Sequence, residues 1–178
     1  MLKKISVDLD RSIFLNADYS VHSGSCIAHQ VEELKDLHDQ YGGFPTTYGI
    51  DNTLIRQLWW TDEQLNFDSI GKQIGMEVIT VSSILQPPGN IIPLHRDTFY
   101  QINKRFPNDK RQKARANIYL EDWKMGHIVQ YNHDDRWITD TGWKAGNGLL
   151  WDSAVLHVGA NIGFENKITL QVSGFIND

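Results

Sequence analysis

The sequence lacks most features that mark secreted, membrane-spanning or nucleic-acid-binding proteins. Its single cysteine, Cys26, excludes a disulfide within the chain. No stretch approaches the roughly 20 apolar residues that span a bilayer. The N-terminus, Met-Leu-Lys-Lys-Ile-Ser-Val-Asp, has no apolar run of the kind found in signal peptides. These absences favour a protein of the reducing cytoplasm.

An excess of basic residues is also missing. The chain has 17 lysines and arginines against 22 acidic residues, which gives a net charge of -5 and disfavours a nucleic-acid substrate. What is present is an ordinary globular composition, with 178 residues of which 40% are hydrophobic. Six tryptophans indicate a large core or a binding pocket. We therefore expect one domain that covers residues 1–178.

Residues 1 to about 76 predict a helical N-terminal part. The segment 25–41 has residues suited to burial at helical spacing, namely Val31, Leu34, Leu37, His38 and Tyr41, and Gly42-Gly43 follows where a helix would end. A second helix is predicted after Thr61, because Gln64 completes a capping box. Its apolar stripe consists of Leu65, Ile70 and Ile74, and Gly75 ends it.

From about residue 77 to residue 178 the pattern changes to short runs of β-branched and aromatic residues separated by turn sequences. We expect strands near 77–86, 91–97, 115–120, 127–131, 148–152, 154–160 and 166–174. The fold class is therefore mainly β, a sandwich or jelly roll. Residues 98–114 and 131–147 are expected to be loops that would shape substrate specificity.

The last predicted strand has a polar and an apolar face. Lys167, Thr169, Gln171 and Ser173 alternate with Ile168, Leu170 and Val172. The polar face either points to solvent or lines a cavity inside the roll while the apolar face supports the N-terminal helices. The metal ligands described next favour the cavity.

Three residues form a candidate catalytic metal site. In extended backbone His95 and Asp97 project from the same face and can share one ion, and His157 supplies a third ligand from an apolar run. Two imidazoles and one carboxylate leave coordination sites open for a co-substrate and dioxygen, whereas structural zinc sites are closed and usually use cysteine. A catalytic zinc ion could use the same ligands. His133, beside Asp134-Asp135, is the best substitute ligand.

Lys167 favours iron chemistry with an anionic co-substrate. It follows His157 by ten residues on the next predicted strand, and Thr169 shares its face. A lysine turned into the roll is costly unless an anion meets it, and the distal carboxylate of 2-oxoglutarate would do so. Arg115, Asn117 and Tyr119 alternate onto one strand face and could bind the co-substrate's carboxylates or order the substrate.

Taken together, the order His95-x-Asp97, His157 and Lys167-x-Thr169 resembles the 2-oxoglutarate/Fe(II)-dependent dioxygenase superfamily over residues 77 to 174. A closer similarity is to its aspartyl/asparaginyl hydroxylase-like branch, although that branch usually has arginine where this chain has Lys167. It is carried by Pro93-Leu94-His95, Arg115, Trp143-x-x-Gly146, Trp151-Asp152 and His157-x-x-x-Asn161. The position of the basic residue equally resembles prolyl-hydroxylase-like enzymes.

The resemblance implies a double-stranded β-helix with the N-terminal helices packed on its larger sheet. It also implies a hydroxylase that uses Fe(II), 2-oxoglutarate and dioxygen on a C–H bond of a small-molecule or peptidyl substrate, with release of succinate and carbon dioxide. His95, Asp97 and His157 would hold the iron, and Lys167 and Thr169 the far carboxylate. Two alternatives stay open: a cupin-like metal-dependent enzyme without 2-oxoglutarate, and a non-catalytic jelly-roll binding module.

Overall fold

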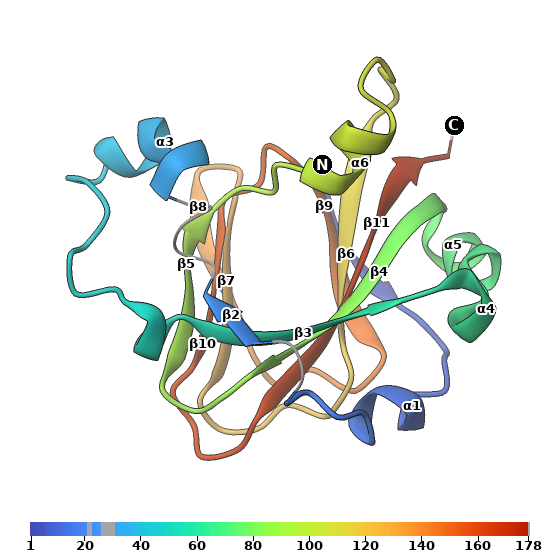
Figure 1. The fold of residues 1–178 in the computed structure, drawn as a ribbon, viewed down its shortest axis with the longest axis horizontal. Coiled ribbons are helices and arrows are strands. Elements are labelled where there is room, and N and C mark those ends of the chain that lie inside the picture. Colours follow the sequence, from blue (N-terminus) through green and yellow to red (C-terminus); the bar gives the residue numbers. More distant parts are fainter. Residues whose placement is uncertain (21–22, 26–30, 178) are drawn as a thin grey trace.

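The chain forms two facing antiparallel sheets with helices on the outside (Figure 1). The computed structural model describes residues 1–20, 23–25 and 31–177. The larger sheet has seven strands in the order β1 (Leu2–Ser6), β9 (Asn147–Asp152), β6 (Lys113–Tyr119), β11 (Lys167–Ile176), β4 (Met76–Gln86), β3 (Leu54–Trp60) and β2 (Ser23–Ser25). The smaller sheet has four, in the order β5 (Asn90–His95), β10 (His157–Asn161), β7 (His127–His133) and β8 (Arg136–Asp140).

From β4 onward the chain crosses repeatedly between the two sheets. β4, β6, β9 and β11 lie in the larger sheet, and β5, β7, β8 and β10 lie in the smaller one. This is the winding of a jelly roll, and it confirms the fold class expected from the sequence. Strands from opposite ends of the second half are therefore neighbours, as β5 and β10 are.

All seven predicted strands are present, with altered ends. The strand predicted at 154–160 begins only at His157, because residues 153–156 belong to a turn whose Val155 N–H donates to the Asp152 carbonyl at 3.3 Å. The strand predicted at 91–97 ends at His95, so Asp97 lies just beyond it.

The N-terminal part, predicted as helical, also contains strands, because β1, β2 and β3 extend the edges of the larger sheet. The predicted loops also contain structure, namely β8 within 131–147 and the helix α6 (Tyr100–Arg105) within 98–114. β1 and β8 are edge strands with mostly exposed side chains, so they lack the alternation that reveals a half-buried strand.

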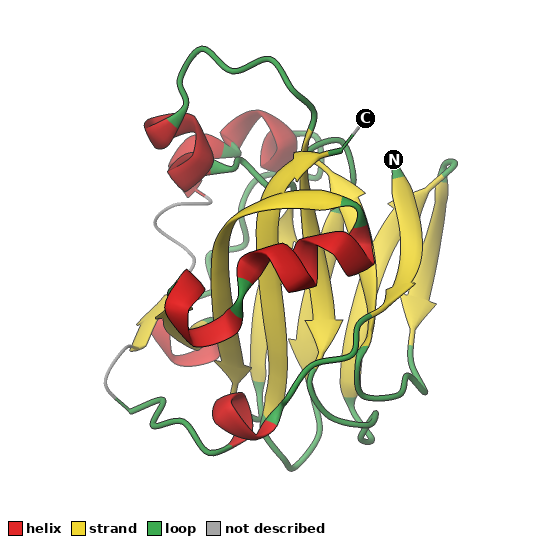
Figure 2. Ribbon diagram, turned by 90° about the vertical axis from the view of Figure 1, so that its right-hand side faces the viewer, coloured by secondary structure: helices red, strands yellow, loops and turns green. Residues whose placement is uncertain are grey.

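The second predicted helix is confirmed, but it is interrupted and forms two short helices. Thr61 and Gln64 form the capping box of α4 (Asp62–Leu65), and Asn66, in left-handed conformation, separates it from α5 (Phe67–Ile74). Figure 2 shows this helical stretch lying across the sheet. Ile70 and Ile74 of α5 join one core with β11, which also includes Phe14 of α1 (Ser12–Leu15). These helices therefore cover the larger sheet, as expected.

The first predicted helix differs in place and extent. Residues 26–30 lie outside the described residues, 31–33 are helical, and α3 (Lys35–Asp39) follows. Leu34, Leu37 and His38 are buried as predicted, whereas Val31 and Tyr41 are exposed. The His38 imidazole Nε2–H donates to the Leu94 carbonyl at 2.8 Å, so α3 lies against β5 of the smaller sheet and not, as expected, on the larger sheet.

The last strand, β11, has the orientation that the sequence predicted. Leu170 and Val172 are fully buried in the core beneath α5, while Lys167, Thr169 and Ser173 are buried in the space between the two sheets.

The short helix η1 (Ile50–Asn52) completes the fold. Among the described residues, no helix has the length and apolar character needed to cross a bilayer.

Candidate metal centre

His95, Asp97 and His157 converge on one point between the sheets. His95 ends β5 and His157 begins β10, and the two residues are direct partners in the antiparallel ladder. Their ring centroids lie 4.0 Å apart. Asp97 follows β5 by two residues, and one potential ligand atom from each of the three residues lies within 4.8 Å of the others. The jelly-roll winding thus closes the distance between motifs far apart in sequence.

Backbone hydrogen bonds orient both imidazoles. The Nδ1 atom of His95 lies 2.8 Å from the Pro93 carbonyl, and that of His157 lies 3.0 Å from the Val155 carbonyl. A carbonyl oxygen only accepts, so each Nδ1 carries the proton and each Nε2 keeps a lone pair for a metal. Burial lowers the pKa of His157 and lowers that of His95 to about 3, so both rings are neutral near pH 7.

Asp97 is held as an anion by its neighbours. Burial opposes its ionisation, but the positive charge of Arg115 outweighs this together with other contacts, so the pKa of Asp97 is lowered. Arg115 Nε lies 2.8 Å from Asp97 Oδ1 as an ion pair, although it makes no well-aligned hydrogen bond. The indole N–H of Trp151 donates to Asp97 Oδ2 at 2.7 Å.

This donor set fits a divalent iron ion. Two neutral imidazoles and one carboxylate on one side of an ion leave further positions open for other ligands. The Trp151 indole holds the carboxylate by a hydrogen bond, and backbone carbonyls hold the imidazoles in the same way. Such outer contacts are typical of metal sites, because they hold the ligands in one orientation before the ion arrives.

Lys167 is buried on β11, the strand that follows β10 in the sequence. Its ammonium group donates to the Ile128 carbonyl at 2.8 Å, to Gln86 Oε1 at 3.3 Å and to the Ala160 carbonyl at 3.4 Å. These acceptors are all neutral, and burial lowers the pKa of Lys167 to about 7. Within the described part of the chain, this desolvated amino group is thus held by neutral acceptors and has no carboxylate beside it.

A glycine leaves space beside that ammonium group. Gly159 lies on β10, two residues after His157, and pairs with Ile92 of β5. A Cβ atom placed on Gly159 would lie 3.6 Å from Lys167 Nζ and 3.8 Å from Ile92. Any side chain at position 159 would therefore contact the ammonium group of Lys167.

The other predicted co-substrate residues lie on the inner face of the larger sheet. Thr169 and Tyr119 are partners across β11 and β6, as are Gln171 and Asn117. Thr169 and Asn117 are buried. The Tyr119 hydroxyl donates to Asp140 Oδ2 at 2.7 Å and its ring stacks on Trp143 at 3.9 Å, so its polar group is engaged away from the triad.

A cavity of about 280 Å³ lies next to the triad on the Arg115 side. His95, Asp97 and Arg115 contribute to its wall. Neutral polar groups also line it, among them Gln57, Thr80, Ser82, Gln171 and Ser173. Gln57 comes from β3, a strand that the sequence pattern did not predict, and the role of Trp151 beside Asp97 was not predicted either.

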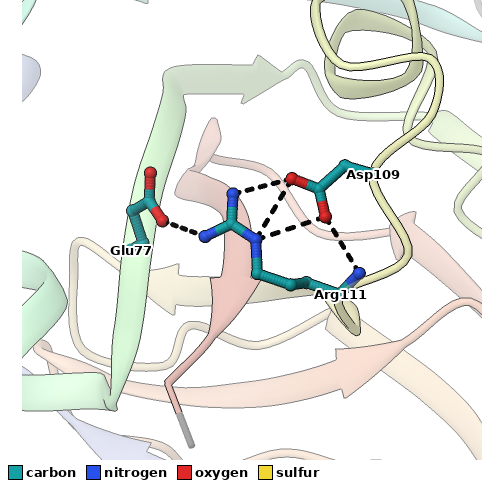
Figure 3. A network of polar contacts seen from close by, with 3 residues as sticks. All are labelled: Glu77, Asp109 and Arg111. Carbon is teal, nitrogen blue, oxygen red and sulfur yellow. Dashed lines mark hydrogen bonds and ion pairs between the residues drawn. The ribbon is translucent and has the colours of Figure 1, made fainter.

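Helix α6 and the segment that follows it form part of the cavity's surroundings. Phe99 and Ile102 line the cavity and pack with Phe175 of β11. Figure 3 shows Arg111 between Asp109 and Glu77, and its guanidinium lies 3.9 Å over the Phe175 ring. Arg111 and Glu77 are about half exposed, so this ion pair contributes little to stability. His133, the substitute ligand, is partly exposed at the end of β7 and does not belong to the triad group.

The similarity to known proteins is one of fold. No protein-family model matches the sequence, and no curated protein matches it. A prolyl-4-hydroxylase from Pseudomonas putida is similar in structure with a TM-score of 0.56 and 16% identity, covering 99% of this chain and 92% of that chain. SnoK, a non-haem α-ketoglutarate-dependent carbocyclase from nogalamycin biosynthesis, has a TM-score of 0.59 and 11% identity, covering 99% and 79%. The epimerase SnoN of the same biosynthesis has a TM-score of 0.52 and 15% identity, covering 83% and 73%. The chain thus has the fold found in these three enzymes.

Proposed function

We propose that this chain is an Fe(II)- and 2-oxoglutarate-dependent dioxygenase, an oxidoreductase that hydroxylates a C–H bond of its substrate and releases succinate and carbon dioxide. The observation that carries the proposal is the pairing of a buried two-histidine, one-carboxylate group with a buried cation that only neutral acceptors hold. The fold of a prolyl-4-hydroxylase and of SnoK supports it.

His95, Asp97 and His157 would hold the iron, whose chemistry when bound is the activation of dioxygen with electrons from 2-oxoglutarate. His95 and His157 offer Nε2 lone pairs, because their Nδ1 protons are bonded to carbonyls. Asp97 offers a negative charge, which favours the binding of a divalent cation. Trp151 restrains this carboxylate, so that it does not rotate away from the ion.

Lys167 would neutralise the far carboxylate of 2-oxoglutarate, with Thr169 as a hydroxyl donor on the same strand face. Gly159 adds no side chain beside Lys167 Nζ, so we place along this part of β10 the path by which the ligand would run from the triad to Lys167. Burial between the two sheets excludes water from this path, which strengthens the ion pair and protects the oxidant from side reactions. Dioxygen and a small-molecule or peptidyl substrate are the remaining partners.

Anaerobic addition of Fe(II) and then 2-oxoglutarate tests the proposal directly. Chelation of the iron by the keto acid gives a visible charge-transfer band, which we expect in the unaltered protein and not in His157→Ala. Circular dichroism and thermal unfolding of the variant check that its fold persists. Absence of the band in the folded, iron-loaded protein would reject the co-substrate and leave a metalloenzyme of another class.

A further inference from the structure

We infer that the cavity beside the triad binds a substrate that carries a carboxylate group, and that Arg115 is the residue that recognises this group. The inference rests on the proposed function, since it takes the iron and 2-oxoglutarate sites as given. It assigns Arg115 to the substrate, whereas the sequence left open whether Arg115 binds the co-substrate or the substrate.

Arg115 and Lys167 lie toward opposite ends of the inner face of the larger sheet. Arg115 pairs with Ser173 across β6 and β11, and Ser173 is six residues from Lys167 on the same strand. Six residues of strand span about 20 Å. Arg115 lies against Asp97 of the triad, while Lys167 Nζ lies beside Gly159, two residues after His157, so the two cations flank the triad from different sides. A 2-oxoglutarate molecule anchored on Lys167 therefore lies on the Lys167 side of the triad, whereas the Arg115 guanidinium lines the cavity on the Asp97 side.

The charges of the loaded site leave the guanidinium group of Arg115 without a full counter-charge. Iron(II) and Lys167 together bring three positive charges, and the same number of negative charges comes from Asp97 and the two carboxylates of 2-oxoglutarate. Arg115 adds one further positive charge, and its side chain is only 18% exposed. A buried cation is costly unless an anion meets it, so the complete site favours a substrate with one negative charge.

The guanidinium is already placed for a carboxylate. It lies against an oxygen of Asp97 and donates from Nη1 to Gln171 Oε1 at 2.5 Å, while the ring of Phe99 lies 5.9 Å from its Cζ atom. These contacts fix the plane of the guanidinium group. A guanidinium group held in one plane binds a carboxylate through two parallel hydrogen bonds. When Asp97 binds a metal, its charge is shared with the ion, and Arg115 gains capacity for a second carboxylate.

No other cation of the cavity wall is as well suited. Arg96 is about 39% exposed and is paired with Asp36 at 2.9 Å, so solvent and a carboxylate already compensate it. Apart from Asp97 of the triad, the rest of the polar lining is neutral; Gln57, for example, donates to Ser82 Oγ at 2.9 Å. A volume of about 280 Å³ accommodates a small molecule or one side chain, which limits the carboxylate to a compact ligand.

The test compares small acids with their own amides on the anaerobic protein saturated with Fe(II) and 2-oxoglutarate. The probes are N-acetylglycine, N-acetylalanine, N-acetylphenylalanine, benzoate and 4-hydroxybenzoate, each beside its primary amide, and binding is measured by calorimetry. We expect at least one acid to bind about ten- to a hundredfold more tightly than its amide, because a hydrogen bond to a charged group has about this strength. Arg115→Gln should remove the preference.

Control variants separate the substrate role from other roles of Arg115. Arg111→Gln removes an arginine that is also paired with carboxylates but lies outside the cavity, and it should keep the preference for acids. Arg115→Lys retains the charge and should keep part of it, which guards against a folding defect in Arg115→Gln. Thermal unfolding checks the fold of each variant.

Three results would overturn the inference. They are the absence of binding by any acid, equal affinities of acids and amides in the unaltered protein, and unchanged acid affinity in folded Arg115→Gln. A loss of 2-oxoglutarate affinity in Arg115→Gln, with acid affinity retained, would place Arg115 in the co-substrate site instead. Failure of the proposed function itself is distinguishable, because the unaltered protein would then not bind 2-oxoglutarate in the first titration.

Discussion

Trp151 donates its indole N–H to Asp97 Oδ2 at 2.7 Å, so a core side chain of β9 holds the one carboxylate of the candidate metal centre. The same ring lies 4.5 Å from that of His157. A single buried tryptophan therefore contacts two of the three candidate ligands. Its indole nitrogen fixes the rotation of the carboxylate and its ring limits the movement of the imidazole.

Trp151→Phe should weaken iron binding while the fold persists. Phenylalanine keeps an aromatic ring in the core but removes the hydrogen bond, and loss of such an outer contact typically costs 10- to 100-fold in metal affinity. A chelator competition titration measures the change. Trp143→Phe is the matched control, since Trp143 is also buried but stacks on Tyr119. Equal iron affinities in both variants would mean that the Trp151 hydrogen bond does not support the site.

The convergence of the three candidate metal ligands could be predicted from the sequence, because the His-x-Asp spacing is local and the third candidate stood in a distinctive apolar run. The polarity of β11 was equally readable, since strict alternation reports which face is buried. The Trp151 contact could not be predicted, because 54 residues separate it from Asp97 and only the packing of the two sheets brings them together. Gln57 could not be predicted as a cavity residue, because β3 has half-buried side chains on both faces and so shows no clear alternation of polar and apolar residues.

Lys167→Ala should keep iron binding and lose 2-oxoglutarate binding. The substitution removes the cation opposite a desolvated carboxylate but leaves all three candidate metal ligands intact. Breaking a buried pair costs about 3–5 kcal/mol. This corresponds to a fall in affinity of roughly two to three and a half orders of magnitude. Anaerobic titration of the iron-loaded protein measures it, and unchanged affinity would remove Lys167 from the co-substrate site.

Lys167→Arg should be far milder than Lys167→Ala. The guanidinium keeps the charge and can bind a carboxylate through two hydrogen bonds. In the present structure Lys167 also donates to Gln86 Oε1 and to two carbonyls, so the larger group must find room among them. The same titration should give an affinity much closer to that of the unaltered protein. An arginine variant as weak as the alanine variant would mean that shape, and not charge, governs this end of the site.

Gly159→Ala should weaken 2-oxoglutarate binding without changing any charge. The added methyl group would lie 3.6 Å from Lys167 Nζ, which is ordinary contact for the free protein but occupies space that the carboxylate needs. The fold and iron affinity should be preserved. Titration of 2-oxoglutarate tests this, with Gly49→Ala as the control, since a Cβ atom there meets nothing within 4 Å. A carboxylate bound elsewhere would leave Gly159→Ala indistinguishable from that control.

The affinity for 2-oxoglutarate should fall as the pH rises above neutrality. Burial lowers the pKa of Lys167 to about 7, and only its protonated form neutralises a carboxylate. Below pH 7 the ammonium is present before binding, so affinity is greatest there. Above pH 7 the ligand must draw a proton onto the lysine, which costs up to about tenfold in affinity for each pH unit.

Arginine stays protonated throughout, so the decline in 2-oxoglutarate affinity should vanish in Lys167→Arg. Titrations of iron-saturated protein between pH 6 and 9, with proton uptake measured in buffers of different ionisation enthalpy, distinguish the two. A decline of the same slope in Lys167→Arg would assign the titrating group to another residue.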